Sequence, residues 1–205
     1  MLCRKRAQFP ALRAALEARG IPVEVVGLGG LLTVPEVQDI VATLRVMHDP
    51  TAADALARLL TSPRWRIGPR DLVTLGRRSR WLARSAGRSA GQEQTQPGEA
   101  DPDVMRQAVT DLTADPGSLV EALDDLGDPA AYSAAGYARL TALAAELRAL
   151  RGHAGRPLPE LVGEVERALG LDIEVAARPG ADPAGSHADL DAFADAAAAF
   201  AGDQE

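Results

Sequence analysis

Cysteine is almost absent from this 205-residue chain, which contains Cys3 alone. A single cysteine excludes an internal disulfide, and the three scattered histidines do not have the spacing of a metal site. Such cysteine usage is typical of a reducing compartment, so we predict a cytoplasmic protein. Long apolar runs are missing too, and no stretch approaches the roughly 18 apolar residues that a membrane span requires. We therefore expect no membrane partner.

Aromatic residues are also scarce, at 3% of a chain in which hydrophobic residues reach 46%. The core must therefore be built from Ala, Leu and Val, and the abundance of Ala and Leu favours helices over strands. Apolar residues at helical spacing, with their caps and stops, predict helices at about 7–19, 33–47, 51–62, 69–85, 102–113, 117–126, 129–151 and 157–169, and after Ser186. The polar segments 86–101 and 176–185 are predicted to be loops, the first of them flexible.

The N-terminal residues have a different pattern, because two short apolar segments flank the first predicted helix. Residues 1–4 have the character of a strand end, and residues 22–26 that of a second strand, followed by a glycine-rich turn at 27–30. The order strand–helix–strand predicts a short β-α-β fragment of a parallel sheet in an otherwise mostly α chain. Because two strands alone do not make a stable sheet, we expect the remaining strands to come from sequence outside this chain.

Positive charge is confined largely to the first part of the chain. Residues 1–90 contain 15 basic and 7 acidic residues, whereas residues 91–205 contain 7 basic and 22 acidic residues. Within 64–88 only Asp71 opposes eight arginines, which are Arg64, Arg66, Arg70, Arg77, Arg78, Arg80, Arg84 and Arg88. Guanidinium groups suit phosphate, so the cluster indicates DNA contact. A solvated helix face is the alternative interpretation.

The turn between two predicted helices, Trp65 to Pro69, lies inside this cluster. A helix–turn–helix pair can present backbone N–H groups and a helix N-terminus to phosphate. Gly68 would permit close approach of the backbone, and Ile67 could insert into the core. A plain αα-hairpin would also use glycine here. We expect Trp65 and Trp81 to serve packing rather than base stacking.

Several blocks of residues, in order, resemble the UvrD/Rep/PcrA DNA helicases of superfamily 1. Residues 2–8 (Leu-Cys-Arg-Lys-Arg-Ala-Gln) are similar to motif IV of that family. Residues 26–27, 36–40 and 44–45 resemble the next block, a glycine-rich turn and a helix that ends in Leu-Arg. Arg66-Ile67-Gly68 is similar to the family's Gly-Ile-Gly turn, with Arg66 in place of the first glycine. The resemblance covers about residues 1–85.

The resemblance implies an architecture and an activity. Residues 1–50 would be a fragment of the second RecA-like motor domain, and residues 51–205 a helical inserted subdomain of the 2B type. The parent would be an ATP-dependent 3′–5′ DNA helicase of repair or recombination that uses ATP and Mg²⁺. The sequence has no G-x-x-x-x-G-K-[ST] loop, so we expect the chain to be inactive alone, to bind neither cofactor tightly and to end before the motor domain resumes.

The resemblance also implies site residues. Arg4 and Gln8 would contact ATP together with the missing motor domain, with Cys3 in place of the aromatic residue that stacks on adenine. Duplex DNA, or a duplex–single-strand junction, would be contacted by Arg64, Arg66, Ile67, Gly68, Arg70 and Arg77. The partners would be DNA and the missing motor domains of the same protein. The alternative is a non-catalytic helical protein-interaction module whose acidic half, 101–205, docks onto another protein.

Overall fold

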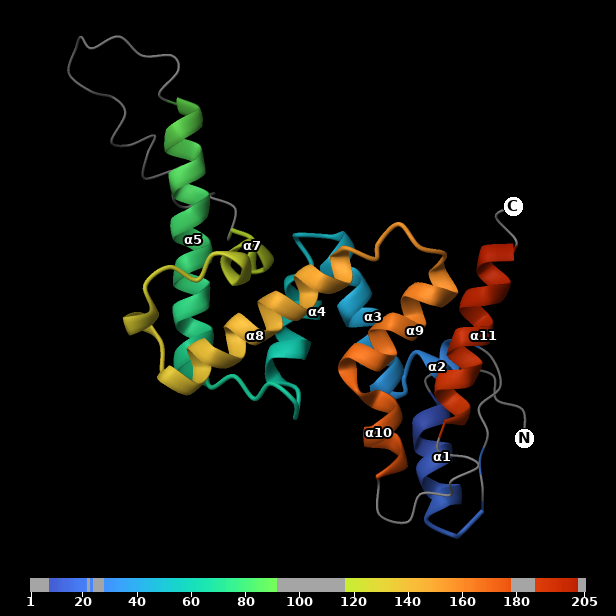
Figure 1. Cartoon of the computed structure of the whole chain (residues 1–205). Helices are drawn as coiled ribbons and strands as arrows, with labels where there is room; N and C mark the ends of the chain where they lie inside the picture. Colours follow the sequence, from blue (N-terminus) through green and yellow to red (C-terminus); the bar gives the residue numbers. More distant parts are fainter. Residues whose placement is uncertain (1–7, 22, 24–27, 92–116, 178–186, 203–205) are drawn as a thin grey trace, which may run out of the picture. The chain divides into compact units, whose positions relative to one another are not determined.

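The computed structural model describes residues 8–21, 23, 28–91, 117–177 and 187–202 (Figure 1). All regular structure in these residues is helical, which confirms the prediction of a mostly α-helical chain. No strand occurs among them. The two strands predicted for the β-α-β fragment, at 1–4 and 22–26, lie outside the described residues except for Val23, which has no regular structure. The β-α-β fragment of a RecA-like domain is therefore not shown.

The chain divides into two compact units. Unit 1 combines residues 1–38 with residues 170–205, and unit 2 comprises residues 39–169. The division falls inside helix α3 (Pro35–His48) and directly after helix α9 (Leu158–Leu169), whereas the sequence led us to expect a boundary near residue 50. The assignment of 1–50 to a motor-domain fragment and of 51–205 to an inserted subdomain stays a prediction.

Unit 1 contains four further helices, which are α1 (Phe9–Glu17), α2 (Leu28–Leu31), α10 (Leu171–Ala176) and α11 (Ala188–Gly202). Helix α1 lies within the predicted range, and α2 is a single helical turn where we predicted a glycine-rich turn. Helix α10 was not predicted. It follows Gly170, which has a left-handed φ of 68°, and its Leu171 and Val175 are buried. Burial of these two side chains stabilises a six-residue helix that would be marginal in isolation.

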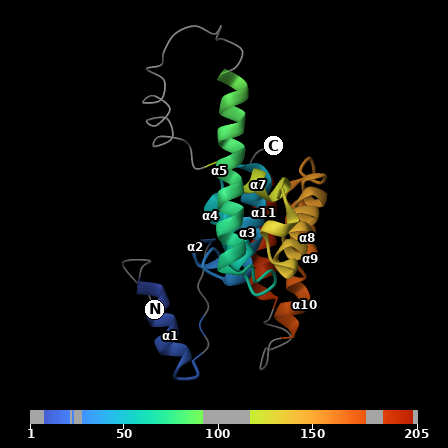
Figure 2. The ribbon, with the colours of Figure 1, turned by 90° about the vertical axis from the view of Figure 1, so that its left-hand side faces the viewer.

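Unit 2 contains most of the buried apolar surface of the described residues. Besides α3 and α9 it has α4 (Ala53–Thr61), α5 (Pro69–Gly91), α7 (Leu119–Asp124), the 3-10 helix η3 (Pro129–Ala131) and α8 (Ala134–Arg151). The core is dominated by leucine and alanine, as the composition required, and its largest fully buried side chains include Leu56, Leu60, Leu75, Leu123, Leu140, Leu143 and Leu147. Helix α5 packs against α7, and its C-terminal end extends beyond α7 in both views (Figures 1 and 2).

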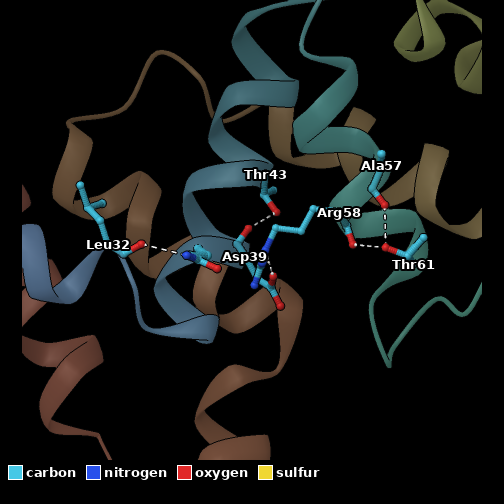
Figure 3. A network of polar contacts seen from close by, with 7 residues as sticks. Leu32, Asp39, Thr43, Ala57, Arg58 and Thr61 are labelled. Carbon is cyan, nitrogen blue, oxygen red and sulfur yellow. Dashed lines mark hydrogen bonds and ion pairs between the residues drawn. The ribbon is translucent and has the colours of Figure 1, made fainter. Parts of the chain in front are cut away.

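Two ion pairs join α3 to α4. Arg58 Nε donates to Asp39 Oδ1 at 2.6 Å (Figure 3), and Arg45 makes two bonds to the Asp54 carboxylate at 2.9 and 3.1 Å. The earlier residue of α3 pairs with the later residue of α4, so the two helices run antiparallel. The side chain of Asp39 also lies one turn from Thr43, whose hydroxyl donates to the Asp39 carbonyl at 2.8 Å. The hairpin of α3 and α4 fixes the position of the C-terminal end of α4, from which the predicted DNA-contact turn continues.

Two helix bounds differ from the sequence-based expectation. Helix α5 continues to Gly91, so the first residues of the predicted flexible loop at 86–101 are helical, and the rest of that loop lies outside the described residues. The single helix predicted over 129–151 is broken, because Tyr132 and Ser133 are extended. Ser133 instead caps α8, with its hydroxyl accepting from Gly136 N at 3.0 Å. The helix predicted at 102–113 lies outside the described residues.

Candidate nucleic-acid interface

In the turn between α4 and α5, residues 62–68, buried and exposed side chains alternate. Trp65 and Ile67 are 8% and 5% exposed and belong to the core of unit 2, while Arg64 and Arg66 are exposed. Arg66 N donates to Ser62 O and Ile67 N donates to Leu60 O, both at 2.9 Å. The two apolar side chains therefore fix the turn to the core, and the two arginines lie on its outer side.

Arg66 has an unusual backbone conformation. Its φ is 46°, which makes it the sole non-glycine residue with positive φ in the described part of the chain. Glycine adopts this left-handed conformation without steric cost, whereas other residues do so at a cost of about 1–2 kcal/mol. The side chain folds back so that Nε donates to Pro63 O at 2.7 Å. A glycine at this position, as in the Gly-Ile-Gly turn that the sequence resembles, would fit the same backbone.

Contacts among the described residues do not require glycine at position 68. A Cβ added there would meet nothing within 4 Å, and the residue does not have a left-handed φ. Gly68 directly precedes α5, and its carbonyl accepts from Asp71 N and Leu72 N at 3.0 Å. The space next to this glycine is therefore open to a close approach by another molecule.

Arg64 is committed to the protein itself. Its guanidinium donates to the Glu146 carboxylate at 2.5 Å and to Ala168 O at 2.7 Å, and it lies 5.1 Å from the centre of the Trp65 ring. Burial raises the pKa of Glu146, and the charge of Arg64 lowers it again only in part. Arg64 thus joins α8 and α9 to the turn, and less of its donor capacity remains for phosphate.

Four exposed arginines lie on one face of α5, and we call this set the arginine face: Arg70, Arg77, Arg80 and Arg84. At 100° per residue, these four positions and the exposed Val73 and Trp81 fall within an arc of about 100°. The face is about 21 Å long from Arg70 to Arg84. Among the described residues, none of the four arginines makes an ion pair, although Arg80 Nε donates to Gly76 O at 3.1 Å.

Asp71, the acidic residue inside this segment, is turned away from the arginine face. It is 4% exposed, and its carboxylate accepts from Ser133 N at 2.8 Å and from Ser133 Oγ at 2.7 Å. These bonds join the start of α5 to the start of α8. Since Asp71 is buried and saturated by Ser133, it does not neutralise the arginines on the opposite side of the helix.

Arg78 is the other arginine of the cluster that turns inward. Its Nε donates to Asp125 O at 2.9 Å, and its Nη2 lies 2.6 Å from Asp125 Oδ2. Its guanidinium also covers one side of the Trp81 ring, 4.2 Å from the ring centre. Arg78 therefore fixes the segment after α7 to α5. The side chain of Arg88 lies outside the described residues.

The predicted site residues are thus separated into distinct environments. Arg66, Gly68, Arg70 and Arg77 follow one another on the exposed side of the turn and of α5, whereas Ile67 is in the core and Arg64 is paired. Arg80 and Arg84 belonged to the arginine cluster seen in the sequence but not to the predicted site residues, and Trp81 was expected to serve packing. The seven-residue spacing of Arg70, Arg77 and Arg84, which returns to nearly the same side of a helix, could have identified the face.

The predicted ATP contacts are only partly described. Arg4 lies outside the described residues, and Gln8 is exposed directly before α1, where its side chain makes no capping hydrogen bond. One exposed amide does not define a nucleotide site, so the fit of ATP to this chain rests on residues that are not described. No group of side chains suited to a metal ion occurs in the described part of the chain. Among the described helices, none has the length and apolar character needed to cross a membrane.

Comparison with known proteins gives one family. Residues 1–85 match the model of the UvrD-like helicase C-terminal domain, and no curated protein matches the chain. The match includes α1, α3, α4, the turn at 62–68 and the part of α5 that bears the arginine face. It agrees with the resemblance found in the sequence over the same residues. Residues 1–85 are therefore similar to a UvrD-like helicase C-terminal domain, and the match does not extend to residues 86–205.

Proposed function

We propose that the chain is a fragment of an ATP-dependent 3′–5′ DNA helicase of repair or recombination, in which the turn at 62–68 and the arginine face bind duplex DNA. The observation that carries the proposal is the partition of charge on α5. Four arginines share one exposed face without a carboxylate partner among the described residues, while Asp71 is buried on the other side. A merely solvated helix usually interleaves charges of both signs.

The geometry of the face suits a phosphate backbone. Its length of about 21 Å corresponds to about six steps of one DNA strand at 3.4 Å per step. Guanidinium groups donate several hydrogen bonds in a fixed plane, which favours phosphate over a point-like counterion. With four phosphate contacts, the logarithm of affinity should fall against the logarithm of salt concentration with a slope of about −3.6, or about 50-fold for a threefold rise in salt.

The turn before α5 supports the same proposal. Gly68 leaves open space where the chain's own packing does not require it, and a backbone without Cβ can approach a phosphate closely. The N-terminus of α5 follows at once, and its dipole favours an anion. The exposed Arg66, whose Nε donates to Pro63 O, adds a positive charge to the same turn.

The ATP site is a separate part of the proposal. Arg4 and Gln8 would complete a nucleotide site only together with the other motor domain of the parent helicase, and the cation of Arg4 would offset charge on the transferred phosphoryl group. ATP and Mg²⁺ would supply the energy of the parent's reaction. We expect no ATP hydrolysis by the chain alone. A cytoplasmic setting, predicted from the cysteine content, is part of the same proposal.

The test is DNA binding by the full chain at several salt concentrations. The variant Arg70→Gln/Arg77→Gln/Arg84→Gln removes three charges from the arginine face. Each loss should make the salt slope shallower by about 0.9. The control variant Arg148→Gln/Arg156→Gln/Arg167→Gln removes three charges from exposed arginines that pair with carboxylates, and it should keep the wild-type slope. Equal loss in both variants, or no binding of wild type to a duplex at low salt, would contradict the proposal.

A second candidate function is the helical protein-interaction module. Residues 91–205 are strongly acidic, and the described part of unit 1 exposes four large apolar side chains, of which Ile173 at 71% and Phe200 at 59% are the most exposed. Exposed apolar residues of this size favour contact with another surface. The two functions are distinguished by the arginine-face variant, because a protein partner of 101–205 would be retained by it while duplex DNA would be lost.

A further inference from the structure

The two tryptophans of the chain have opposite environments. Trp65 is 8% exposed and packs in the core of unit 2, whereas Trp81 is 48% exposed on α5. An exposed indole leaves a large apolar area in contact with water, and tryptophan is enriched where a partner binds. The packing role expected for both tryptophans from the sequence therefore accounts for Trp65, whereas Trp81 stays about half exposed in the part of the chain that the structure describes.

The ring of Trp81 is held in place from one side. The Arg78 guanidinium lies 4.2 Å from its centre, and Arg78 is itself fixed by two bonds to Asp125, one to the carbonyl oxygen and one to the carboxylate. Gly127 sits against the same guanidinium, since a Cβ there would lie 3.1 Å from its central carbon. Because the guanidinium cannot move away easily, the indole is oriented before any ligand arrives, which reduces the entropic cost of binding.

The surroundings of Trp81 are cationic along the helix. Arg77 lies one turn before it and Arg84 nearly one turn after it, on the same arginine face. The two arginines are about 10 Å apart along the helix axis, with the indole between them. An aromatic ring between two cations is the combination that binds a single nucleic-acid strand, where the ring stacks on a base and the cations contact the backbone.

We propose that Trp81 stacks on an unpaired base, so that α5 binds the single-stranded arm of a duplex–single-strand junction beside the duplex contact. Bases inside a duplex are stacked on one another and offer no free face to the indole, which makes this contact selective for an unpaired strand. The inference rests on the proposed function, since the arginine face supplies the phosphate contacts on both sides of the ring. The stacking contact would distinguish an unpaired strand from a duplex, whereas the arginines respond to the phosphate charge that both share.

Tryptophan fluorescence tests this contact in the full chain. Trp65 and Trp81 are the two tryptophans, and the buried Trp65 should not sense a ligand at α5. An oligothymidylate strand should quench the wild-type emission, and a blunt duplex of equal length should quench it much less. In Trp81→Leu the remaining emission should be unaffected by the strand. Removal of one stacked base should weaken binding of the strand about five- to 150-fold.

Three controls separate the possible outcomes. Trp81→Phe keeps an aromatic face and should recover part of the lost affinity, whereas Val73→Ala, at an exposed apolar position of the same helix, should bind like wild type. All variants should melt within a few degrees of wild type, because the substituted side chains are half exposed. If Trp81→Leu keeps its affinity for the strand, or loses duplex affinity equally, the stacking contact is wrong while the arginine face stands. If wild type binds neither probe, both proposals are wrong.

Discussion

The substitution Gly136→Ala should be among the most damaging changes that a single methyl group can make in unit 2. A Cβ at this position would lie 2.0 Å from Asp71 Oδ2 and 2.5 Å from Asp71 Cγ. Asp71 would have to leave its place between α5 and α8, and with it the bonds from Ser133 N and Oγ at 2.8 and 2.7 Å. Gly136 is required because a carboxylate occupies the space of its side chain.

The magnitude follows from the groups involved. Each hydrogen bond to a charged group contributes about 1.5–3 kcal/mol, and a buried carboxylate without partners costs about 3–5 kcal/mol in total. Alanine in a helix recovers up to about 1 kcal/mol relative to glycine. We therefore expect Gly136→Ala to lower the free energy of unfolding of unit 2 by about 2–4 kcal/mol, or roughly 5–15 °C in Tm.

A matched substitution gives the opposite sign. Gly163 lies inside α9, and a Cβ there would meet only an Arg167 nitrogen at 3.9 Å, an ordinary contact. Gly163→Ala should therefore stabilise unit 2 by about 0.5–1 kcal/mol. Urea unfolding followed by Trp65 fluorescence reports on unit 2, because Trp65 lies in its core. The reasoning is refuted if Gly136→Ala unfolds at the wild-type urea concentration or above it.

Three further predictions concern the turn and its support. Arg66→Gly should be about 1 kcal/mol more stable than Arg66→Ala in urea unfolding, because only glycine accepts a φ of 46° freely; equal stability would mean that the turn relaxes. Gly68→Ala should change stability by less than about 1 kcal/mol and yet weaken duplex binding in a titration, since the space is open in the free protein; unchanged affinity would count against close approach. Burial raises the pKa of the Glu146 carboxyl above its ordinary 4.5, so the folded state binds its proton more tightly than the unfolded state does. The wild type therefore loses stability as the pH rises from 4.5 through the higher pKa of the folded state. Glu146→Gln should therefore gain stability relative to wild type as the pH rises above 4.5, and a difference that does not change with pH would contradict the shift.

The sequence could predict the helices whose signals are local. Pro35, Pro63 and Pro69 mark the ends of α3, α4 and α5 within two residues, because proline at a first turn or after a last turn acts on its own neighbours. The break at Tyr132 could not be predicted in this way. It depends on Asp71, which is 62 residues away from Ser133 in sequence and bonds to it in the fold.

Contacts between residues far apart in the sequence also limited the prediction of the candidate site. Eight arginines against one acid were visible in the sequence, but their division was not, because Arg64 and Arg78 find their carboxylates 82 and 47 residues further along the chain. A count of charges treats all eight as equal. The fold pairs two of them with carboxylates and leaves Arg66 and the four of the arginine face exposed, while the side chain of Arg88 lies outside the described residues.

The two paired arginines still affect the surface from which they are withdrawn. Arg78 makes its ion pair with Asp125 and at the same time covers one side of Trp81, so the bond that joins α5 to the segment after α7 also orients the exposed ring. Arg64 joins the turn to α8 and α9, and thereby holds the start of α5 where Gly68 is open. Internal ion pairs thus hold the backbone of the turn and of α5, from which the exposed arginines extend. Because a fixed helix keeps the spacing of these arginines along its axis, this division of the cluster favours a polyanion whose phosphates are regularly spaced over one of any geometry.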